Sequence, residues 1–376
     1  MRLTFNEEEQ ALAKTALDFA HRHSPVARFR ALRKTDGPRY SPELYTKMAE
    51  LGWLGVHVPE ELGGVGLGFT ELAIILENLG RTLTPEPLVA SLALGGYTLM
   101  LGASDDVKQQ LVPALATGER TFTLAHAEHT HRHDRTFCQT RAEKTPQGWV
   151  LTGQKKNVID GDSVSDLLVV ARISGRDNDR DGLGIFHIQS DAPGLTRTAL
   201  QRMDFRGAAD LTLDKVIAQP ITSSSNAADV IDQVLDRATI ALCAEALGGI
   251  RQAFDASVQY LKDRVQFGVP IGSFQALQHR ASKLFAEVEL ARSIVLAAAR
   301  AVDEAPERVA ELAAAAKATV DETFLHVTRE GIQFHGGVGV TDEYDIGLYL
   351  KRAHIVAGTL GDATFHRQRW ATLQGY

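Results

Sequence analysis

The stretch RVQFGVPIGSFQALQH, from Arg264 to His279, guides the interpretation of the whole sequence. It follows one predicted helix and precedes another, so it is a helix–helix connection of unusual length and polarity. An arginine followed three residues later by an aromatic residue can hold a phosphate and stack on a planar ring. A capping loop with a buried Phe267 is the alternative. Two interpretations therefore stay open, a nucleotide-binding loop and an ordinary helix connection.

The sequence after this stretch predicts long helices. Apolar residues recur there at alternating spacings of four and three, namely Leu277, Ala281, Leu284, Val288, Ala291 and Val295. This heptad pattern is typical of a long helix packed against other helices or a partner subunit. The alanine-rich run 309–323 also predicts helix, because alanine has the highest helix propensity. Residues 223–376 are therefore expected to form a helical bundle.

The part before the stretch divides into a helical and a β segment. In residues 1–120, helix N-termini are predicted at Asn6, at Ser41-Pro42 and at Thr70. Residues 121–222 instead hold short apolar runs between turn-rich segments, which predicts antiparallel strands. The expected strands are Thr121–Ala125, Trp149–Thr152, Leu167–Ile173, Leu183–Ile188 and Leu211–Val216. The predicted class is mainly α with a central β domain.

Composition excludes several classes of protein. The 376 residues include 40 Lys and Arg against 47 Asp and Glu, and the resulting charge of −7 argues against nucleic-acid binding. No apolar run approaches the roughly 20 residues that span a bilayer. The N-terminus has no secretory signal pattern, and two cysteines are too few for a disulfide framework. We therefore expect a cytoplasmic protein with no membrane span.

Two glycine-rich segments, Gly63–Gly68 and Gly336–Gly339, superficially resemble dinucleotide-binding loops. Neither follows a predicted strand in a βαβ unit, so a Rossmann interpretation has little support. For Gly63–Gly68, the expected role is a loop that needs positive φ before the Thr70 helix.

Taken in order, the motifs resemble those of the acyl-CoA dehydrogenase family. They are Pro59–Gly64, Leu111–Glu119, Leu151–Lys155, Arg264–His279 and Gln333–Gly339. The resemblance covers nearly the whole chain. It implies an N-terminal helical domain (1–120), a middle antiparallel β domain (121–222) and a C-terminal four-helix bundle (223–376) that carries the FAD and oligomer interface.

The resemblance also implies FAD as the cofactor, an acyl-CoA substrate and electron-transfer flavoprotein as the acceptor. Family members form dimers or tetramers with FAD across a subunit interface. Two segments would bind FAD, the first through Arg264, Gln266, Phe267 and Gln275, and the second through Gln333, Gly336 and Gly337. Arg264 would contact the pyrophosphate, Phe267 would lie by the adenine end and Gln275 would support it. The second segment would meet the pyrophosphate of an FAD held chiefly by the neighbour.

The usual catalytic base is missing. The family reaction needs a carboxylate close to the carbon alpha to the thioester. The resemblance places that carboxylate at Leu360 or, in some members, at Ala238, and neither residue can accept a proton. Asp236, which with Arg237 would line the acyl cavity, is the candidate displaced base. Two residues along a helix turn a side chain about 200°, so Asp236 is alternatively a carboxylate favoured by the helix dipole.

The β-domain part of the flavin site also departs from the family pattern. In residues 127–134, Glu128 and Asp134 match that pattern, but bulky residues replace its glycine and serine. Asn157-Val158-Ile159 stands where the family has a tryptophan-containing run beside the flavin ring. We therefore expect another chain to supply the β-domain flavin contacts.

A histidine cluster raises a separate possibility. Alternation would place His129, His131 and His133 on one face of a strand, where imidazoles could ligate zinc or copper, and His126 lies nearby. No nearby helix supplies a second ligand pair. We predict a solvated or ligand-edge cluster and no metal site.

The leading hypothesis is a flavin-linked acyl-CoA dehydrogenase subunit in fatty acid or steroid catabolism. It would pair with a paralogous chain that brings the base, as in heteromeric bacterial members, whose small subunits it resembles around Leu277–Arg280 and Leu242–Glu245. A homo-oligomer with an unconventional base is the second version. A catalytically silent scaffold and a flavin monooxygenase-like relative are the alternatives.

Overall fold

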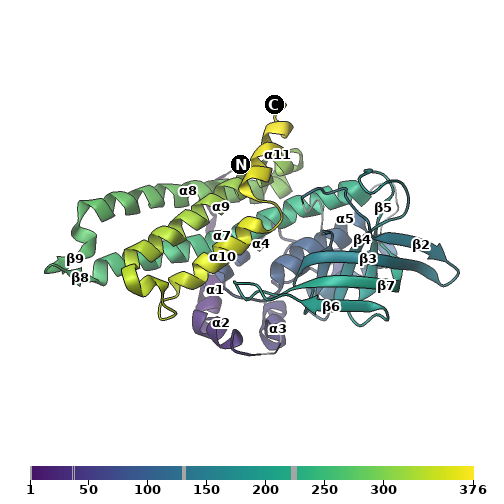
Figure 1. Ribbon diagram of the computed structural model, residues 1–376, viewed down its shortest axis with the longest axis horizontal. Helices are drawn as coiled ribbons and strands as arrows, with labels where there is room; N and C mark the ends of the chain where they lie inside the picture. The colour runs from purple at the N-terminus through teal and green to yellow at the C-terminus, as the bar shows by residue number, and fades with distance from the viewer. Residues whose placement is uncertain (1, 36, 38, 129–132, 222–226) are drawn as a thin grey trace. The chain divides into compact units, whose positions relative to one another are not determined.

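A computed structural model describes residues 2–35, 37, 39–128, 133–221 and 227–376 (Figure 1). The chain divides into two compact units. The first comprises Met1–Thr35, Phe69–Thr84 and Thr239–Tyr376, and the second comprises Asp36–Gly68 and Pro85–Ala238. The fold is mainly helical with a central β region, as predicted. The expected three-domain boundaries stay a prediction.

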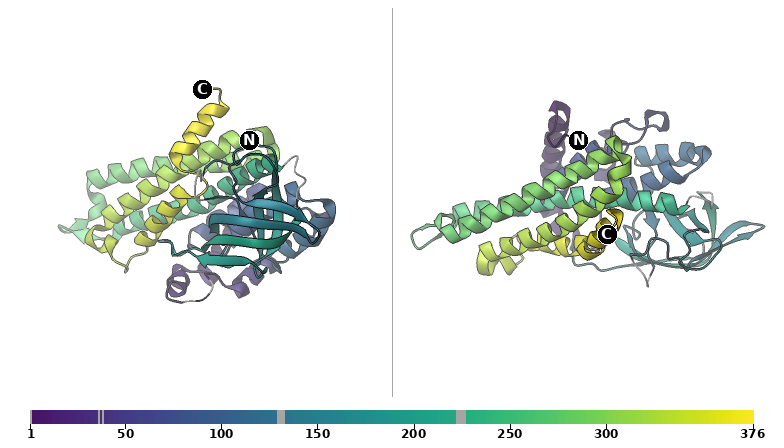
Figure 2. Two further views of the ribbon diagram at one scale, coloured as in Figure 1. Left: turned by 45° about the vertical axis from the view of Figure 1, so that its right-hand side comes forward. Right: turned by 90° about the horizontal axis from the view of Figure 1, so that it is seen from above.

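The first unit is almost entirely helical. Its α-helices are α1 (Glu7–His23), α2 (Val26–Leu32), α4 (Phe69–Gly80), α7 (Ala227–Asp263) from Thr239 onward, α8 (Gln275–Glu304), α9 (Val309–His335), α10 (Ile346–Gly358) and α11 (Ala363–Leu373). Short 3₁₀ turns lie between them at η3 (Ile271–Ser273), η4 (Pro306–Arg308) and η5 (Gly336–Val340). Helices α8 and α9 pack side by side, and α9 also contacts α10 and α11 (Figure 2).

Local sequence signals explain where these helices begin and how they pack. Asn6 caps α1 as predicted, and a reciprocal bond from the Glu9 side chain completes a capping box. The predicted heptad pattern lies in α8, where its members from Leu284 to Val295 are buried. Gly80 of α4 lies so close to α7 that a Cβ there would be 2.0 Å from the carbonyl oxygen of Glu245. These helices therefore cross with their backbones nearly in contact.

The second unit combines short helices with a β-barrel. Its helical elements are α3 (Pro42–Glu50), η1 (Glu60–Leu62), η2 (Val89–Gly96), α5 (Tyr97–Gly102), α6 (Asp105–Ala116) and the start of α7. Ser41 caps α3, and Gly63 and Gly66 have the predicted positive φ of 82° and 72°. Element η2 is a π-helix of eight residues, a rare form that the sequence did not predict.

Seven strands form the barrel. They are β1 (Phe122–Ala125), β2 (Arg141–Thr145), β3 (Gly148–Ile159), β4 (Asp166–Arg172), β5 (Leu183–Gln189), β6 (Leu195–Ala199) and β7 (Ala208–Pro220). The order β1-β4-β2-β3-β7-β5 closes on itself because β4 also pairs with β5, while β6 pairs with β7. Most pairs are antiparallel, as expected.

Three expectations about the barrel need correction. Strand β1 pairs with β4 in parallel, and β2 meets β4 in parallel through a single residue pair. The sequence missed β2 and β6, whose residues are largely exposed and polar and so lack an apolar pattern. Strands β3 and β7 extend well beyond the predicted Trp149–Thr152 and Leu211–Val216, since β-bulges interrupt the alternation on which the prediction relied.

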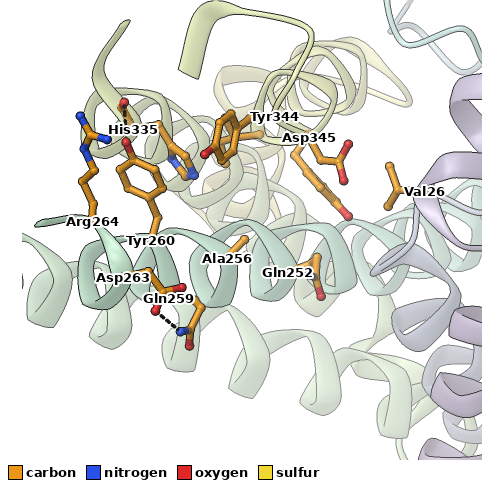
Figure 3. A pocket seen from close by; sticks show the side chains of 12 residues that line it. Val26, Gln252, Ala256, Gln259, Tyr260, Asp263, Arg264, His335, Tyr344 and Asp345 are labelled. Carbon is orange, nitrogen blue, oxygen red and sulfur yellow. Dashed lines mark hydrogen bonds between the residues drawn. The ribbon is translucent and has the colours of Figure 1, made fainter. Parts of the chain in front are cut away.

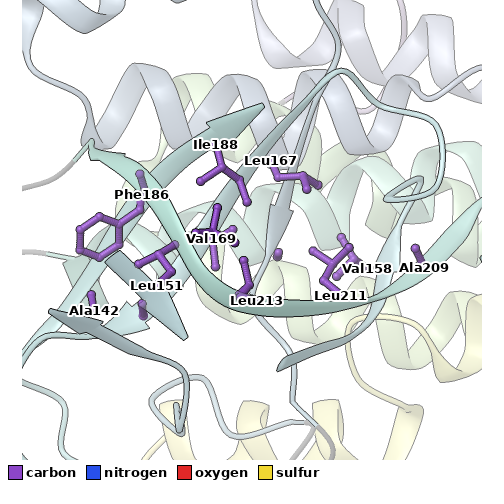
Figure 4. Close-up of a cluster of buried hydrophobic side chains, with 14 of the residues drawn as sticks. Ala142, Leu151, Val158, Leu167, Val169, Phe186, Ile188, Ala209, Leu211 and Leu213 are labelled. Carbon is purple, nitrogen blue, oxygen red and sulfur yellow. The ribbon is translucent and has the colours of Figure 1, made fainter. Parts of the chain in front are cut away.

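Apolar side chains from opposing strands fill the barrel interior (Figure 4). Leu151, Val169, Leu211 and Leu213 are at most 2% exposed there. At one end, the guanidinium of the 1%-exposed Arg172 donates to four backbone carbonyls. They belong to Thr136, Asp177, Asp179 and Asp181, at 2.6 to 2.9 Å. Arg172 therefore ties the segment after β1 to the loop between β4 and β5.

Candidate functional site

The Arg264–His279 stretch forms a short β-hairpin between α7 and α8. Strand β8 (Val265–Gln266) pairs with β9 (Val269–Pro270), and Phe267 and Gly268 make the turn. Both turn residues have positive φ, 54° and 81°, as a two-residue hairpin turn of type I′ requires. The turn residue Phe267 is not a glycine, so its backbone is held in a conformation that L-residues rarely adopt.

The hairpin exposes its apolar side chains. Phe267 is 90% exposed, and Val265, Val269 and Phe274 are 39 to 52% exposed. The interpretation of this stretch as a capping loop with a buried phenylalanine is therefore wrong. A group of neighbouring exposed apolar side chains, as opposed to a single one, is typical of a surface that meets a ligand or a partner.

The predicted cofactor-binding side chains of the hairpin region are accessible. Within the described residues, the Arg264 guanidinium has neither an ion-pair nor a hydrogen-bond partner, and Gln275, the first residue of α8, has no side-chain hydrogen bond. Gln266 donates only to the carbonyl of the adjacent Val265, at 2.9 Å. These side chains remain available for a ligand or another chain.

The second glycine segment begins where α9 ends. Gln333 is exposed on the last turn, and Gly336 has φ 63° and ψ −142°, a combination open essentially to glycine alone. A Cβ at Gly336 or at Gly337 would meet no atom within 4 Å. The backbone at these two glycines therefore faces open space and can be approached closely.

Aromatic contacts bring the ends of α7 and α9 together. The rings of Tyr260 and His335 stack at 4.2 Å, and the Tyr260 hydroxyl donates to the His335 carbonyl at 3.3 Å. Tyr344 packs edge-on against both rings. On α8, the Arg280 guanidinium lies 5.2 Å from the centre of the Phe334 ring. The two predicted cofactor segments are thus neighbours in the first unit.

A cavity of about 480 Å³ lies beside this aromatic cluster (Figure 3). Figure 3 shows Tyr260, His335 and Tyr344 gathered together, with Arg264 next to Tyr260. The cavity is lined by Val26, Gln252, Ala256, Gln259, Tyr260, Asp263, Arg264, His335, Tyr344, Asp345, Ile346 and Tyr349. Five of these residues lie on α7, from Gln252 to Asp263, and they carried no distinctive sequence signal because they are spread over twelve residues of one helix.

In the second unit, Asp236 is an ion-pair partner. The carboxylate is 6% exposed and accepts a 2.8 Å bond from the guanidinium of Arg135, which also contacts Asp232. The neighbouring Arg237 lies 5.4 Å over the Tyr97 ring and donates to the Gln233 carbonyl. The pairing with Arg135 gives Asp236 an anchoring contact that competes with a role as base.

The segment after β1 is held by a buried charge network. Lys155, fully buried on β3, donates to the Glu128 carboxylate at 2.7 Å and to the His126 carbonyl at 3.2 Å. Glu128 also accepts from the backbone of Gln139 and from Thr140. Burial alone would raise the pKa of Glu128, but Lys155 and these hydrogen bonds lower it to about 2.

Other predicted features of this segment have mixed outcomes. His126 lies outside the strands, and burial lowers the pKa of its imidazole to about 4. His129 and His131 fall outside the described residues, so their proposed strand face is not described. Elsewhere in the described chain, no cluster of three or more His, Cys, Asp or Glu residues could hold a metal ion.

Neither expected base position carries a carboxylate. Ala238 is fully buried in α7, and Leu360 lies in the connection between α10 and α11 with a φ of 59°. For the ranges that the structure covers, no helix is both long and apolar enough to cross a membrane.

The comparisons with known proteins agree with this fold. The family models for the N-terminal and C-terminal domains of acyl-CoA dehydrogenases match residues 6–119 and 228–371. Acyl-CoA dehydrogenase IpdE2 of Mycobacterium tuberculosis is 31% identical over 353 residues, covering 94% of this chain and 92% of the relative.

Two solved structures are similar over almost their whole length. The Tcur3481–Tcur3483 steroid ACAD G363A variant has a TM-score of 0.87 and 32% identity, with 98% of each chain covered. The ChsE4–ChsE5 complex from Mycobacterium tuberculosis has a TM-score of 0.89 and 26% identity, with 100% and 99% covered. This chain belongs to the acyl-CoA dehydrogenase family, the FAD-dependent oxidoreductases that act on a CH–CH bond of an acyl-CoA.

Proposed function

We propose that this chain is one subunit of a heteromeric acyl-CoA dehydrogenase that forms an α,β double bond in a CoA thioester. The observation that carries the proposal is a difference between the predicted nucleotide-binding segments and the predicted base positions. The nucleotide-binding segments around Arg264 and Gly336 are open, whereas both positions for a base hold apolar residues, Leu360 and Ala238. A related chain would supply the carboxylate and the β-domain contacts to the flavin.

The residues present fit the diphosphate part of FAD. Arg264 offers a guanidinium with no partner in the described chain, and a guanidinium fork matches phosphate oxygens. Gly336 and Gly337 leave backbone free for close approach, and Gln333 and Gln275 add amide side chains. Bound FAD would accept the hydride from the β carbon of the substrate. We assign Arg264 to the pyrophosphate and the exposed Phe267 to the adenine end.

The paired names of the similar structures support an unlike partner. The Tcur3481–Tcur3483 steroid ACAD and the ChsE4–ChsE5 complex each carry two chain names, and the former is named for steroids. By analogy, we propose a paralogous partner chain, a fatty acyl or steroid acyl-CoA substrate and an electron-transfer flavoprotein as acceptor. A cytoplasmic location follows from the same proposal.

Asp236 and Arg237, on the side of the acyl substrate, have a structural role in this proposal and not a catalytic one. We place Asp236 and Arg237 at the acyl cavity, where the Arg135 contact fixes the Asp236 carboxylate. In this arrangement Asp236 positions the neighbouring segment, and proton removal falls to the partner's carboxylate.

Coexpression with an adjacent acyl-CoA dehydrogenase gene tests the proposal. Flavin content and dehydrogenation of butyryl-CoA, octanoyl-CoA and a steroid side-chain CoA thioester would be measured for the chain alone and for the pair. We expect flavin and activity in the pair only. Full activity of the chain alone, unchanged in Asp236→Asn, would rule out both the pair and the displaced base.

A catalytically silent scaffold is the second candidate, because both base positions are lost. Arg264→Ala in the pair separates the two. A dehydrogenase subunit should lose about tenfold or more in flavin affinity, since a charge-assisted bond to phosphate contributes more than 1.4 kcal/mol. If the chain is a scaffold, the pair should keep its flavin, because the partner alone would hold it. Arg22→Ala, an exposed arginine on α1, is the matched control and should change neither readout.

A further inference from the structure

A buried lysine links three elements at one end of the first unit. Lys317, in the middle of α9, is fully buried, and its ammonium contacts both carboxylate oxygens of Asp321 at 2.6 and 2.7 Å. The same nitrogen donates to the carbonyl of Val356 at 3.0 Å and to that of Gly361 at 2.8 Å. Lys317 therefore joins α9 to the last turn of α10 and to the connection that follows it.

The connection between α10 and α11 has an unusual backbone. Leu360 and Gly361 both have positive φ, 59° and 105°. The left-handed conformation costs a residue with a side chain roughly 1 to 2 kcal/mol, so the surrounding contacts must hold Leu360 there. A Cβ at Gly361 would lie 2.5 Å from the Phe365 ring, which leaves this position no alternative to glycine.

Two buried side chains bond to successive carbonyls of the connection. His366 of α11, fully buried, is 2.9 Å from the Leu360 carbonyl through Nε2, while Lys317 holds the next carbonyl. Asp362 accepts from the Phe365 backbone at 2.9 Å and so starts α11 directly after the turn. The carbonyl groups of the two left-handed residues, Leu360 and Gly361, are thus each fixed in direction by a hydrogen bond.

Stability alone is a weak reason for such a lysine. Burial of an ammonium and a carboxylate costs several kcal/mol per ion, and a well-packed apolar pair is often as stable or more so. A buried pair that also bonds two carbonyls on two different elements does something that an apolar pair cannot. It sets the position of one element against another.

We infer that Lys317 is a positioning residue, which holds the α10–α11 connection so that residue 360 projects in one fixed direction. The inference rests on the proposed function, in which residue 360 stands where the family resemblance places a carboxylate base. On this view the chain has lost the carboxylate but kept the support that aims it. Leu360→Glu should then restore a working base.

The first test is local hydrogen exchange in the full-length chain. The variant Lys317→Met/Asp321→Leu removes both charges, so no unpaired ion stays buried. We expect the amides of Phe365 and His366, which donate to the side chain and the carbonyl of Asp362 directly after the connection, to exchange at least tenfold faster, while α9 stays protected. Arg300→Met, which breaks a buried ion pair with Glu9 far from the connection in sequence, is the control and should leave these amides unchanged.

Lys317→Arg is a second variant in case the apolar pair does not fold. The larger guanidinium cannot reproduce the same two carbonyl bonds, so it should also raise exchange at the connection. Unchanged exchange at Phe365 and His366 in either folded variant would overturn the inference.

The second test measures proton removal in the purified pair. The complex carrying Leu360→Glu would be incubated in D₂O with whichever of the three CoA thioesters it dehydrogenates best. The introduced carboxylate takes the α proton, the C–H electron pair moves onto the thioester, and a deuteron from solvent returns to carbon. The exchange step itself consumes no oxidant, and mass spectrometry counts the deuterium in the thioester that has not been dehydrogenated.

The unmodified pair, in which the partner's carboxylate already removes the α proton, sets the background, and we expect the second base at residue 360 to raise deuterium uptake about twofold above it. Adding Lys317→Met/Asp321→Leu should abolish the gain, and adding Arg300→Met should not. In a pair that dehydrogenates the thioester, no gain from Leu360→Glu, or a gain that survives loss of Lys317, would overturn the inference. If no pair dehydrogenates any thioester, the proposed function has failed, and hydrogen exchange alone decides the role of Lys317.

Discussion

The segment after β1 and the hairpin at Phe267 both stand where the family pattern has flavin contacts, but they are built in opposite ways. The segment after β1 is closed on itself, since Lys155 and Glu128 lie buried together and Arg172 binds its backbone. The hairpin at Phe267 is open, with its apolar and polar side chains exposed. A segment that is internally satisfied has little left to offer a ligand, whereas an unsatisfied one is suited to binding. This difference is the one expected if the chain contributes only an edge to a shared site, as proposed above.

The largest expected effect is the loss of stability when the buried Lys155 of the closed segment is removed. Lys155→Met leaves the Glu128 carboxylate buried without its cation and should lower the free energy of unfolding by about 3 to 5 kcal/mol. Lys156→Met is a matched control on the next residue, because its pair with Asp210 is about 30% exposed and contributes less than about 1 kcal/mol. Chemical denaturation measures both. Equal losses would show that burial does not distinguish the two pairs.

Acid should weaken the same segment. Glu128 has a pKa of about 2 when folded and 4.5 when free, so its stabilisation is complete above pH 4.5 and is lost as the pH falls toward 2. The difference corresponds to about 3 kcal/mol at most. The lowered pKa of His126 acts in the same direction, with loss as the pH falls from 6.5 to about 4.

Urea unfolding at pH 7, 5 and 3 checks this dependence. Glu128→Gln should reduce the drop between pH 5 and pH 3, because the replacement has no proton to take up. A drop of the same size in Glu128→Gln would assign the acid sensitivity to other groups.

Adding a methyl group at the turn after α9 should lower the free energy of unfolding less than loss of Lys155 does. Of the two adjacent glycines there, only Gly336 should be sensitive. Gly336→Ala forces a side chain into a glycine-only conformation and should cost about 1 to 3 kcal/mol. Gly337→Ala meets no neighbouring atom and has ordinary φ, so its expected change is within about 0.5 kcal/mol. Thermal unfolding separates them, and a reversed order would contradict the backbone described for this turn.

Phe267→Ser should have the smallest effect on folding and a large one on assembly. The ring is 90% exposed, so the free energy of unfolding should change by less than about 0.5 kcal/mol. Loss of an aromatic anchor from an interface typically costs about 2 kcal/mol or more, roughly thirtyfold in Kd. Analytical ultracentrifugation of the pair measures that loss. Tyr376→Ser, also 90% exposed, is the control; an equal effect there would remove the special role of the hairpin.

The sequence predicted the fold class and most helices because local signals were strong. Asn6 and Ser41 are capping residues with the expected partners, and the heptad pattern of α8 follows its buried face. Strands β2 and β6 escaped because their side chains are mostly exposed, and the parallel pairing of β1 with β4 depends on distant segments. Periodicity reports burial within one element and carries no information on which strand lies next to it.

For the candidate site, the sequence indicated the segments but not their contacts. Exposure of Phe267 contradicted the capping-loop interpretation, and no local pattern predicts an exposed aromatic at a hairpin turn. The Arg135–Asp236 pair joins residues a hundred positions apart, so spacing could not predict it. Lys317 gave no signal either, because a lysine in an alanine-rich helix ordinarily faces solvent.

The four carbonyls around Arg172 have a consequence for how the barrel end opens. Three belong to the loop between β4 and β5 and one to the segment after β1, and together they bind both terminal nitrogens of a guanidinium that is almost fully buried. If one loop moves away, the buried Arg172 guanidinium loses hydrogen bonds that water does not replace, which also weakens its hold on the other loop. The two loops should therefore open together as one cooperative unit, and their amides should exchange with a common opening rate.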